Sequence, residues 1–466
     1  MIVCDTLRAD HLGCYGCPLP TSPGIDRLAA EGTRFVQARS PHIPTQPAHT
    51  TLFSGRDVFA HGVVAHGGAV SPPAALEWLP ERLQRHGVFT AAADNIGRWM
   101  PRGFDVYEPF AVAPSADGYW RKAEAVLAAA GRVLPRLAAA AHHGRPFFGF
   151  FHFWDPHTPY CPPPPFDRLF YDGDERRAGE HGLEAMWAFG PFAEYFQAWM
   201  PGVTDRAFPR AQYAACVRAL DHGVQRLLGM LAAAGCLEDT LVVLTADHGE
   251  ELGEHGVWFD HHGLYETNLR VPLLLWGPGR VPRGLAVADP VTLLDLAPSV
   301  LRALGAPPVP GLPGRDLASA WSGGLPPPAP LYCTECTWQK KQAWLAGRYK
   351  LISALEPDFH GGPDLELYDL AADPGETSNL AAVRPAVAAE LLGQMQAHLA
   401  ARLTGTGSAA DPLRVQAVAS RRIGAPAVAP TPQNAVATHP VADAVSVRVT
   451  AEEKERVSRR LANLGY

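Results

Sequence analysis

The chain has 466 residues, of which 47% are hydrophobic and 19% are charged. This composition excludes a disordered or fibrous protein, and the length predicts one large domain with an appendage or two ordinary domains. With 40 basic and 47 acidic residues the net charge is -7, which leaves no basic excess for nucleic acid or anionic membranes. We therefore expect no nucleic-acid partner.

Strand-like apolar runs alternate with helix-like amphipathic runs along most of the chain. This alternation is typical of an α/β fold, and we expect a large, mixed, mostly parallel sheet flanked by helices. The predicted strands cover residues 1–4, 89–93, 147–153, 241–245 and 271–276. The predicted helices cover residues 24–31, 73–85, 119–141, 211–234 and 293–304.

We expect a catalytic domain over residues 1–325. A Pro-rich and then aromatic segment, about residues 159–209, interrupts its alternating pattern. That insertion is either a lid facing the substrate or a hydrophobic cluster beneath a long loop. Short strands and then a helix predict a small C-terminal α+β subdomain over residues 326–403. Residues 404–466 are expected to form an extended arm and a terminal helix.

The sequence contains no apolar run of the roughly 18 to 20 residues that a membrane span needs, and no secretory signal opens it. Eight scattered cysteines do not have the regular spacing of a disulfide framework. We expect a cytoplasmic protein with no membrane span. The opening run, residues 1–4, reads as the second half of a buried strand, so either that strand is short or the true start lies upstream. The sequence carries no signal for an oligomeric state.

Two predicted strands end in metal-ligand residue types. Asp5 follows the first strand, and the pair Asp247-His248 follows the strand at residues 241–245. In open α/β sheets ligands bind at the carboxyl ends of strands. An adjacent carboxylate and imidazole can bind one cation there.

A third segment, residues 45–56, reads Thr-Gln-Pro-Ala-His-Thr-Thr-Leu-Phe-Ser-Gly-Arg. Thr45 lies where a helix would begin, with Pro47 in the first turn, so free N–H groups and the positive end of the helix dipole face an anionic ester. His49 would share a helix face with Thr45. Taken alone, Thr45 is better interpreted as a simple N-cap.

Together, these segments resemble the sulfatase family of the alkaline-phosphatase superfamily. Residues 5–16 are similar to its first metal motif, residues 45–55 to its nucleophile segment, and residues 247–256 to its second metal motif. The resemblance covers roughly residues 1–400. It implies an alkaline-phosphatase-like fold and metal-dependent hydrolysis of a small-molecule phosphate or sulfate ester.

Two departures from the family pattern bear on the chemistry. Sulfatases carry Cys-x-Pro-x-Arg, whose Cys becomes formylglycine, whereas this chain has Thr45 and His49 at those positions. A threonine cannot become an aldehyde hydrate, so the nucleophile is predicted to be the metal-activated Thr45 hydroxyl. Thr6 also stands where many sulfatases have a second metal-binding Asp.

The resemblance also implies one or two divalent cations per chain. In dinuclear phosphodiesterase relatives, the first site would correspond to Asp5, Thr45, Asp247 and His248. A second site would use Asp155 or Asp260 together with His157 and His262. In the alternative, a one-metal site, His157 and His262 bind the substrate oxyanion. The many histidines favour zinc or manganese, whereas the family resemblance favours calcium, with magnesium also possible.

The leading hypothesis is a hydrolase that cleaves phosphate mono- or diesters through a covalent phosphothreonine at Thr45. His49, His157 and His262 would stabilise the transferred group or protonate the leaving group. Arg8 and Asn95 are candidate substrate-binding residues. The alternatives are a sulfuric ester hydrolase that works without formylglycine, a phosphoryl-group transferase, and a non-catalytic binding protein on the same scaffold.

Overall fold

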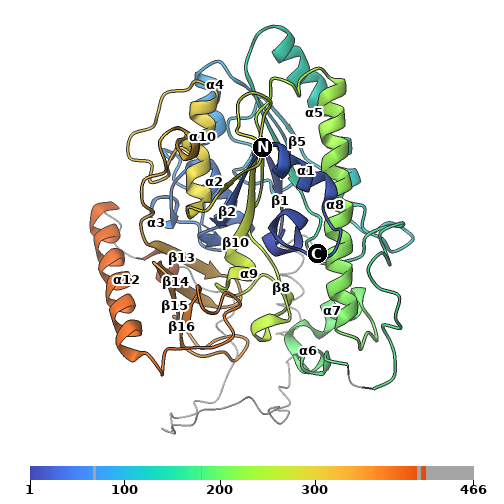
Figure 1. Ribbon diagram of the computed structural model, residues 1–466, viewed down its shortest axis with the longest axis vertical. Coiled ribbons are helices and arrows are strands. Elements are labelled where there is room, and N and C mark those ends of the chain that lie inside the picture. The colour runs from blue at the N-terminus through green and yellow to red at the C-terminus, as the bar shows by residue number, and fades with distance from the viewer. Residues whose placement is uncertain (67–69, 180, 407–410, 416–466) are drawn as a thin grey trace.

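The computed structural model describes residues 1–66, 70–179, 181–406 and 411–415 (Figure 1). A nine-stranded sheet lies at the centre, and a five-stranded sheet lies beside it. Of the extended arm and terminal helix predicted over residues 404–466, residues 407–410 and 416–466 fall outside the described residues. Among the helices described, none combines the length and apolarity needed to cross a bilayer.

The central sheet has the strand order β11-β2-β10-β7-β1-β6-β4-β5, with β12 also paired to β2. Five adjacent strands run parallel, namely β7 (Val242–Ala246), β1 (Ile2–Cys4), β6 (Phe147–Phe153), β4 (Phe89–Ala93) and β5 (Val106–Glu108). The strand β10 (Arg270–Trp276) runs antiparallel to both β7 and β2 (Thr33–Arg39). Short strands β11 (Leu285–Val287) and β12 (Val291–Thr292) complete this mixed sheet.

Helices cover both faces of the central sheet (Figure 1). On one side lie α1 (Pro23–Glu31), α5 (Lys122–His142) and α8 (Ala207–Ala233). On the other lie α2 (Thr45–Ser54), α4 (Leu79–Arg85) and α10 (Leu296–Ala303). In α5 the buried residues Val126, Ala130, Val133 and Leu137 recur at helical spacing, so one face packs on the sheet.

Strand β2 and helix α4 are two of the elements that differ from the sequence-based prediction. Strand β2 was not predicted, because its charged and polar residues mask its buried positions. The helix predicted over residues 73–85 begins only at Leu79. The Glu81 side chain accepts the Trp78 backbone N–H at 2.9 Å, which caps the helix there and leaves the preceding residues as a loop.

The insertion contains three short helices, α6 (Glu184–Ala188), the 3₁₀ turn η3 (Gly190–Phe192) and α7 (Ala193–Trp199). Its side chains Met186, Phe192, Phe196 and Met200 are buried in the main hydrophobic cluster. Of the two interpretations of this segment, the packing agrees with the hydrophobic cluster.

The second sheet has the order β16-β15-β14-β13-β3 and is covered by α12 (Pro385–Thr406) (Figure 1). Its strands are β13 (Leu331–Cys336), β14 (Lys340–Ala346), β15 (Tyr349–Ala354), β16 (Leu365–Asp369) and the short β3 (His42–Ile43). Because β3 immediately precedes α2, this pairing anchors the segment that leads to Thr45.

A buried ion-pair network joins the two sheets. The ammonium of Lys350, on β15, lies 3.2 Å from Glu266 and 2.5 Å from Glu376. Glu266 also accepts hydrogen bonds from the guanidinium of Arg39 at the end of β2. Lys350 is fully buried, so Glu376 depends on it for charge compensation, whereas Glu266 is also compensated by Arg39.

We expect Lys350→Met to lower the free energy of unfolding by about 3–5 kcal/mol, because it leaves a buried carboxylate uncompensated. Urea unfolding followed by circular dichroism measures this change. Arg280→Met is the matched control, since Arg280 pairs with Asp239 at the surface and should change stability little. An equal loss in both variants would contradict the role assigned to Lys350.

Candidate active site

The parallel strands bring their carboxyl ends to one edge of the central sheet. Cys4 of β1 pairs with Phe153 of β6 and with Ala246 of β7. Asp5 and Asp247 are the next residues of β1 and β7, so their side chains meet at this edge. Both carboxylates are fully buried.

Asp5, Asp247 and His248 form a group of potential metal ligands, with one ligand atom of each within 4.8 Å of the others. The Nε2 atom of His248 lies 3.4 Å from Asp247 Oδ2 and 3.7 Å from Asp5 Oδ1. The Nδ1–H of His248 donates to the carbonyl of Gly249, so Nε2 presents its lone pair. Ligands at zinc distances in a tetrahedral site lie about 3.3–3.6 Å apart, which agrees with this spacing.

Three of the four carboxylate oxygens in this group lack a hydrogen-bond partner. Neither oxygen of Asp5 nor Oδ2 of Asp247 accepts a hydrogen bond, although all three atoms are buried. Burying carboxylates without a partner is costly, and a divalent cation would offset that cost. The residues present therefore fit a metal ion.

Thr45 is the first residue of α2 and faces this group. Its hydroxyl oxygen lies 3.3 Å from His248 Nε2. The side chain is 2% exposed, and Pro44, the residue before the helix, provides no side-chain cap. The hydroxyl is thus placed beside the carboxylates at the positive end of a helix dipole, as the sequence predicted.

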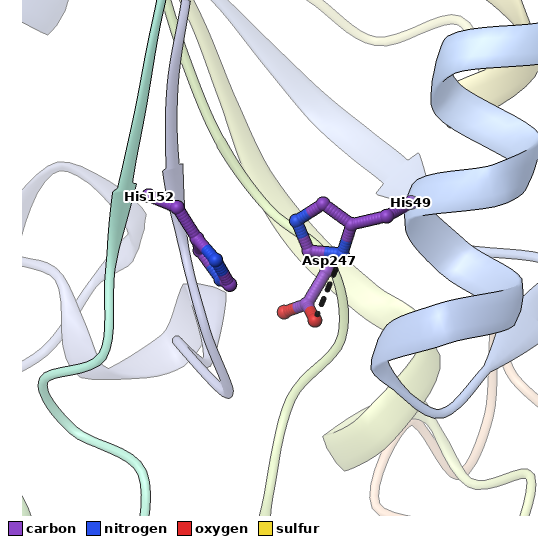
Figure 2. A group of neighbouring side chains, drawn as sticks. All are labelled: His49, His152 and Asp247. Carbon is purple, nitrogen blue, oxygen red and sulfur yellow. Dashed lines mark ion pairs between the residues drawn. The ribbon is translucent and has the colours of Figure 1, made fainter. Parts of the chain in front are cut away.

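His49, one turn further along α2, faces His152 of β6 and Asp247 (Figure 2). One ligand atom of each of these three side chains lies within 4.8 Å of the others, and all three residues are fully buried. His49 Nδ1–H donates to the Thr45 carbonyl at 2.9 Å. His152 Nδ1 lies 2.8 Å from a carboxylate oxygen of Asp94, the residue that follows β4.

The pKa values follow from burial and from neighbouring charges. Burial lowers the pKa of His49 to about 3, aided by the nearby His152. Burial also opposes charge on His152, but the Asp5 and Asp94 carboxylates outweigh it and raise its pKa to about 10. Burial and the Asp5 charge raise the pKa of Asp247 to about 6. Despite burial, His157 and His152 hold the pKa of Asp5 below its usual range.

A third group of possible ligands consists of Glu250, Asp260 and His261. The rings of His261 and His248 are 4.7 Å apart, so this group adjoins the first one. His157 also lies here, with its ring 5.3 Å from that of His261. The Nδ1–H of His157 donates to the Thr158 carbonyl at 2.8 Å.

His262 faces another direction from its neighbour His261. Its Nδ1 lies 3.0 Å from Nε2 of His360, and its ring packs against Phe192 and Trp338. Its Nε2 lies 3.4 Å from an oxygen of Asp260. Among the described residues, the groups of potential ligands include His261 rather than His262.

Three other predicted site residues have different surroundings. Asp155 is buried, which raises its pKa to about 7 against the opposing charge of Lys122, and it belongs to none of the three ligand groups found among the described residues. The guanidinium of Arg8 binds Asp10 and Glu254 and donates to the Glu250 carbonyl, so it braces the segment that follows β7. Asn95 has a buried Oδ1 that accepts no hydrogen bond.

Sequence reasoning missed several residues at this edge of the sheet. His152 is the one basic side chain in the apolar run of β6, and Asp94 directly follows β4, so both carried a detectable signal. Arg98 was also missed. Its guanidinium donates to the side-chain carbonyl of Gln46 at 3.3 Å, which places a cation next to the residue that follows Thr45.

Comparison with known proteins identifies the class to which this fold and site belong. Residues 1–306 match the Sulfatase family, and the chain therefore belongs to that family. It is an ester-bond hydrolase, and members of this family are metal-dependent.

Individual relatives align over most of the chain. The chain is 24% identical to N-acetylglucosamine-6-O-sulfatase of Bacteroides thetaiotaomicron, with 81% of each chain covered. It is 27% identical to arylsulfatase A of Homo sapiens, with 82% of each covered. The phosphonate monoester hydrolase of Agrobacterium radiobacter has a similar fold, with a TM-score of 0.68, 22% identity, and 86% of this chain and 95% of that chain covered. The predicted alkaline-phosphatase-like α/β fold is confirmed.

Proposed function

We propose that the chain hydrolyses phosphate mono- and diesters through Thr45 as the nucleophile. The observation that carries this proposal is the Thr45 hydroxyl, buried at the start of α2 and 3.3 Å from His248 in the Asp5, Asp247 and His248 group. This position in formylglycine sulfatases is a cysteine, and no such cysteine is present here. The side chain that faces the cation ligands is therefore an alcohol.

Asp5, Asp247 and His248, together with Thr45, would hold a divalent cation. When bound, the cation lowers the pKa of the Thr45 hydroxyl and offsets the negative charge of the ester. Two carboxylates, one imidazole and a hydroxyl form a mixed donor set that suits zinc or manganese.

The reaction proceeds in two displacements at phosphorus. The Thr45 oxygen forms a bond to phosphorus while its proton passes to water, and the ester P–O bond breaks with the electron pair leaving on the alcohol oxygen. That alcohol takes up a proton. A water molecule then attacks the phosphothreonine, the bond from phosphorus to Thr45 breaks, and the threonine hydroxyl regains a proton as phosphate leaves from a monoester, or a phosphate monoester leaves from a diester.

The surrounding residues have positioning roles. The N-terminal amides of α2 and the guanidinium of Arg98 provide positive charge for the non-bridging oxygens. The Nδ1–H of His157 is fixed by the Thr158 carbonyl, so its Nε2 is oriented for proton exchange with the leaving group or with water.

A sulfuric ester hydrolase is the second candidate, favoured by the sulfatase relatives. A threonine ester lacks the geminal hydroxyl by which an aldehyde hydrate expels sulfate, so a sulfothreonine would be released slowly. A transferase would use the same phosphothreonine with an alcohol in place of water.

An assay of one purified preparation with three substrates tests this assignment. The substrates are p-nitrophenyl phosphate, bis(p-nitrophenyl) phosphate and p-nitrophenyl sulfate. We expect both phosphate esters to be turned over faster than the sulfate ester, because only phosphothreonine has an efficient hydrolytic route. Added glycerol distinguishes transfer, since a transferase would release glycerol phosphate. Faster turnover of the sulfate ester would reverse the order of the two candidates.

A further inference from the structure

The Asp5 carboxylate faces two histidines through its two different oxygens. Its Oδ1 lies 3.7 Å from Nε2 of His248, whereas its Oδ2 lies 3.6 Å from Nε2 of His152. Both separations are too long for a good hydrogen bond. Both are close to the spacing of two ligands on one tetrahedral ion, about 3.3–3.6 Å. Asp5 is therefore arranged as a carboxylate that bridges two positions.

The position on the His152 side has its own set of donors. Figure 2 shows the imidazoles of His49 and His152 and the carboxylate of Asp247 facing a common space. The ring centroids of His49 and His152 are 4.6 Å apart. The Nε2 atoms of both rings are buried and have no hydrogen-bond partner. Each atom can bind an ion, and at His152, whose pKa is raised by Asp5 and Asp94, the bound ion takes the place of the Nε2 proton.

Outer contacts orient both imidazoles as metal-binding histidines are oriented in proteins. His49 Nδ1–H donates to the Thr45 carbonyl at 2.9 Å, and the same nitrogen lies 3.6 Å from Asp247 Oδ2, the ion pair dashed in Figure 2, so Nε2 is the ring nitrogen left to bind an ion. His152 Nδ1 lies 2.8 Å from Asp94, which in turn accepts a hydrogen bond from the Tyr107 hydroxyl at 2.6 Å. A chain of carboxylate, histidine and metal is a common arrangement that fixes the tautomer of the ligand.

We propose that a second divalent transition-metal ion, such as zinc, binds beside the first, between the residues His49, His152, Asp5 and Asp247. The proposal rests on the proposed function, because the second ion would share the ligands Asp5 and Asp247 with the cation proposed there. The two histidines favour a transition metal over calcium. In the Cys-x-Pro-x-Arg motif a guanidinium occupies the position of His49, and the second ion would supply positive charge at this point.

Cobalt titration of the metal-free full-length chain tests the proposal without an activity readout. Co²⁺ is added to chelator-treated protein, bound metal is counted by elemental analysis, and the visible absorption of bound Co²⁺ is recorded. We expect two equivalents for the unsubstituted chain and one for His152→Gln. Asp94→Asn keeps the ligand but removes its orienting carboxylate, so the second equivalent should bind about 10–100-fold more weakly.

His61→Gln is the matched control. His61 is also fully buried, but its two ring nitrogens contact Thr51 and the Val63 backbone N–H, so it has protein partners on both sides. It should still bind two equivalents. His261→Gln tests the adjoining group of Glu250, Asp260 and His261 and should also retain two.

Two outcomes would overturn the proposal. One equivalent in the unsubstituted chain would mean that His152 acts as a protonated partner of Asp5. Two equivalents in His152→Gln but one in His261→Gln would place the second ion in the adjoining group. The proposed function fails separately, because a chain that binds two Co²⁺ as expected but hydrolyses no phosphate ester retains the second site and loses the assigned activity.

Discussion

Thr45→Ala is expected to lower turnover of phosphate esters by about 10³-fold or more, because it removes the nucleophile and with it the covalent route. The side chain is buried at the first position of α2 and is not needed as a cap, so the fold should survive. Steady-state kinetics with bis(p-nitrophenyl) phosphate, together with circular dichroism, measures both effects. Acid quenching during turnover should trap one phosphoryl group per unsubstituted chain and none in the variant.

Two further variants separate chemistry from structure. Thr45→Ser keeps a hydroxyl and should retain much of the turnover. Thr50→Ala is the helix control, since Thr50 lies on α2, is fully buried, and donates to the Gln46 carbonyl at 2.6 Å. It should lose stability but keep turnover. Undiminished turnover in Thr45→Ala, or phosphate trapped at another residue, would refute the nucleophile assignment.

The central fold was predictable because its elements follow simple periodicities. The buried runs that became β1, β4, β6 and β7 are almost continuously apolar, as parallel strands covered on both faces must be. Strand β2 was not predictable from the sequence, because it pairs antiparallel with β10 near the edge of the parallel core and its charged residues alternate with buried ones. Its assignment depends on a partner about 230 residues away in the sequence, which no local pattern contains.

Much of the candidate site was predictable because strand ends converge in a parallel sheet. Asp5, Asp247 and His248 follow from that rule, Thr45 was predicted from its place at a helix start, and the structure brings all four together. The contribution of His152 was not predicted, since its backbone position is inside β6 and only the register of β6 with β1 and β4 directs it toward Asp5 and Asp94. Side-chain direction in a strand alternates, so one residue decides whether a histidine enters the site.

The pair His261 and His262 also shows that the direction of a side chain decides which histidine joins the site. Both are buried and adjacent, and each places one ring nitrogen 3.4 Å from Asp260, yet only His261 joins the group with Glu250, whereas the other nitrogen of His262 faces His360. The short strand β9 (Trp258–Asp260) ends just before them, and the chain then turns, so the sequence alone could not choose between the two. The prediction that His262 serves as a catalytic or metal-binding residue stays a prediction, and His261 is the better-placed imidazole.

Removal of the metal is expected to abolish turnover and to destabilise the fold, whereas Asp247→Asn should abolish turnover and stabilise the metal-free chain. Without a cation, Asp5 and Asp247 place two carboxylates side by side in a fully buried site. An Asn side-chain carbonyl can still accept the backbone N–H groups of His248 and Thr6, which Asp247 Oδ1 accepts at 2.9 and 3.3 Å. The substitution therefore removes charge and keeps these hydrogen bonds.

We expect the free energy of unfolding of the metal-free Asp247→Asn chain to exceed that of the metal-free unsubstituted chain by about 1–3 kcal/mol. Adding Zn²⁺ should reverse the order, because an ion that binds only the folded state stabilises it in proportion to the logarithm of its concentration over Kd. Urea unfolding with and without Zn²⁺ measures both differences. Asp239→Asn, at an exposed position, should change neither. A metal-free Asp247→Asn chain less stable than the unsubstituted one would mean that Asp247 is compensated by the protein itself, and that the group is not built to hold a cation.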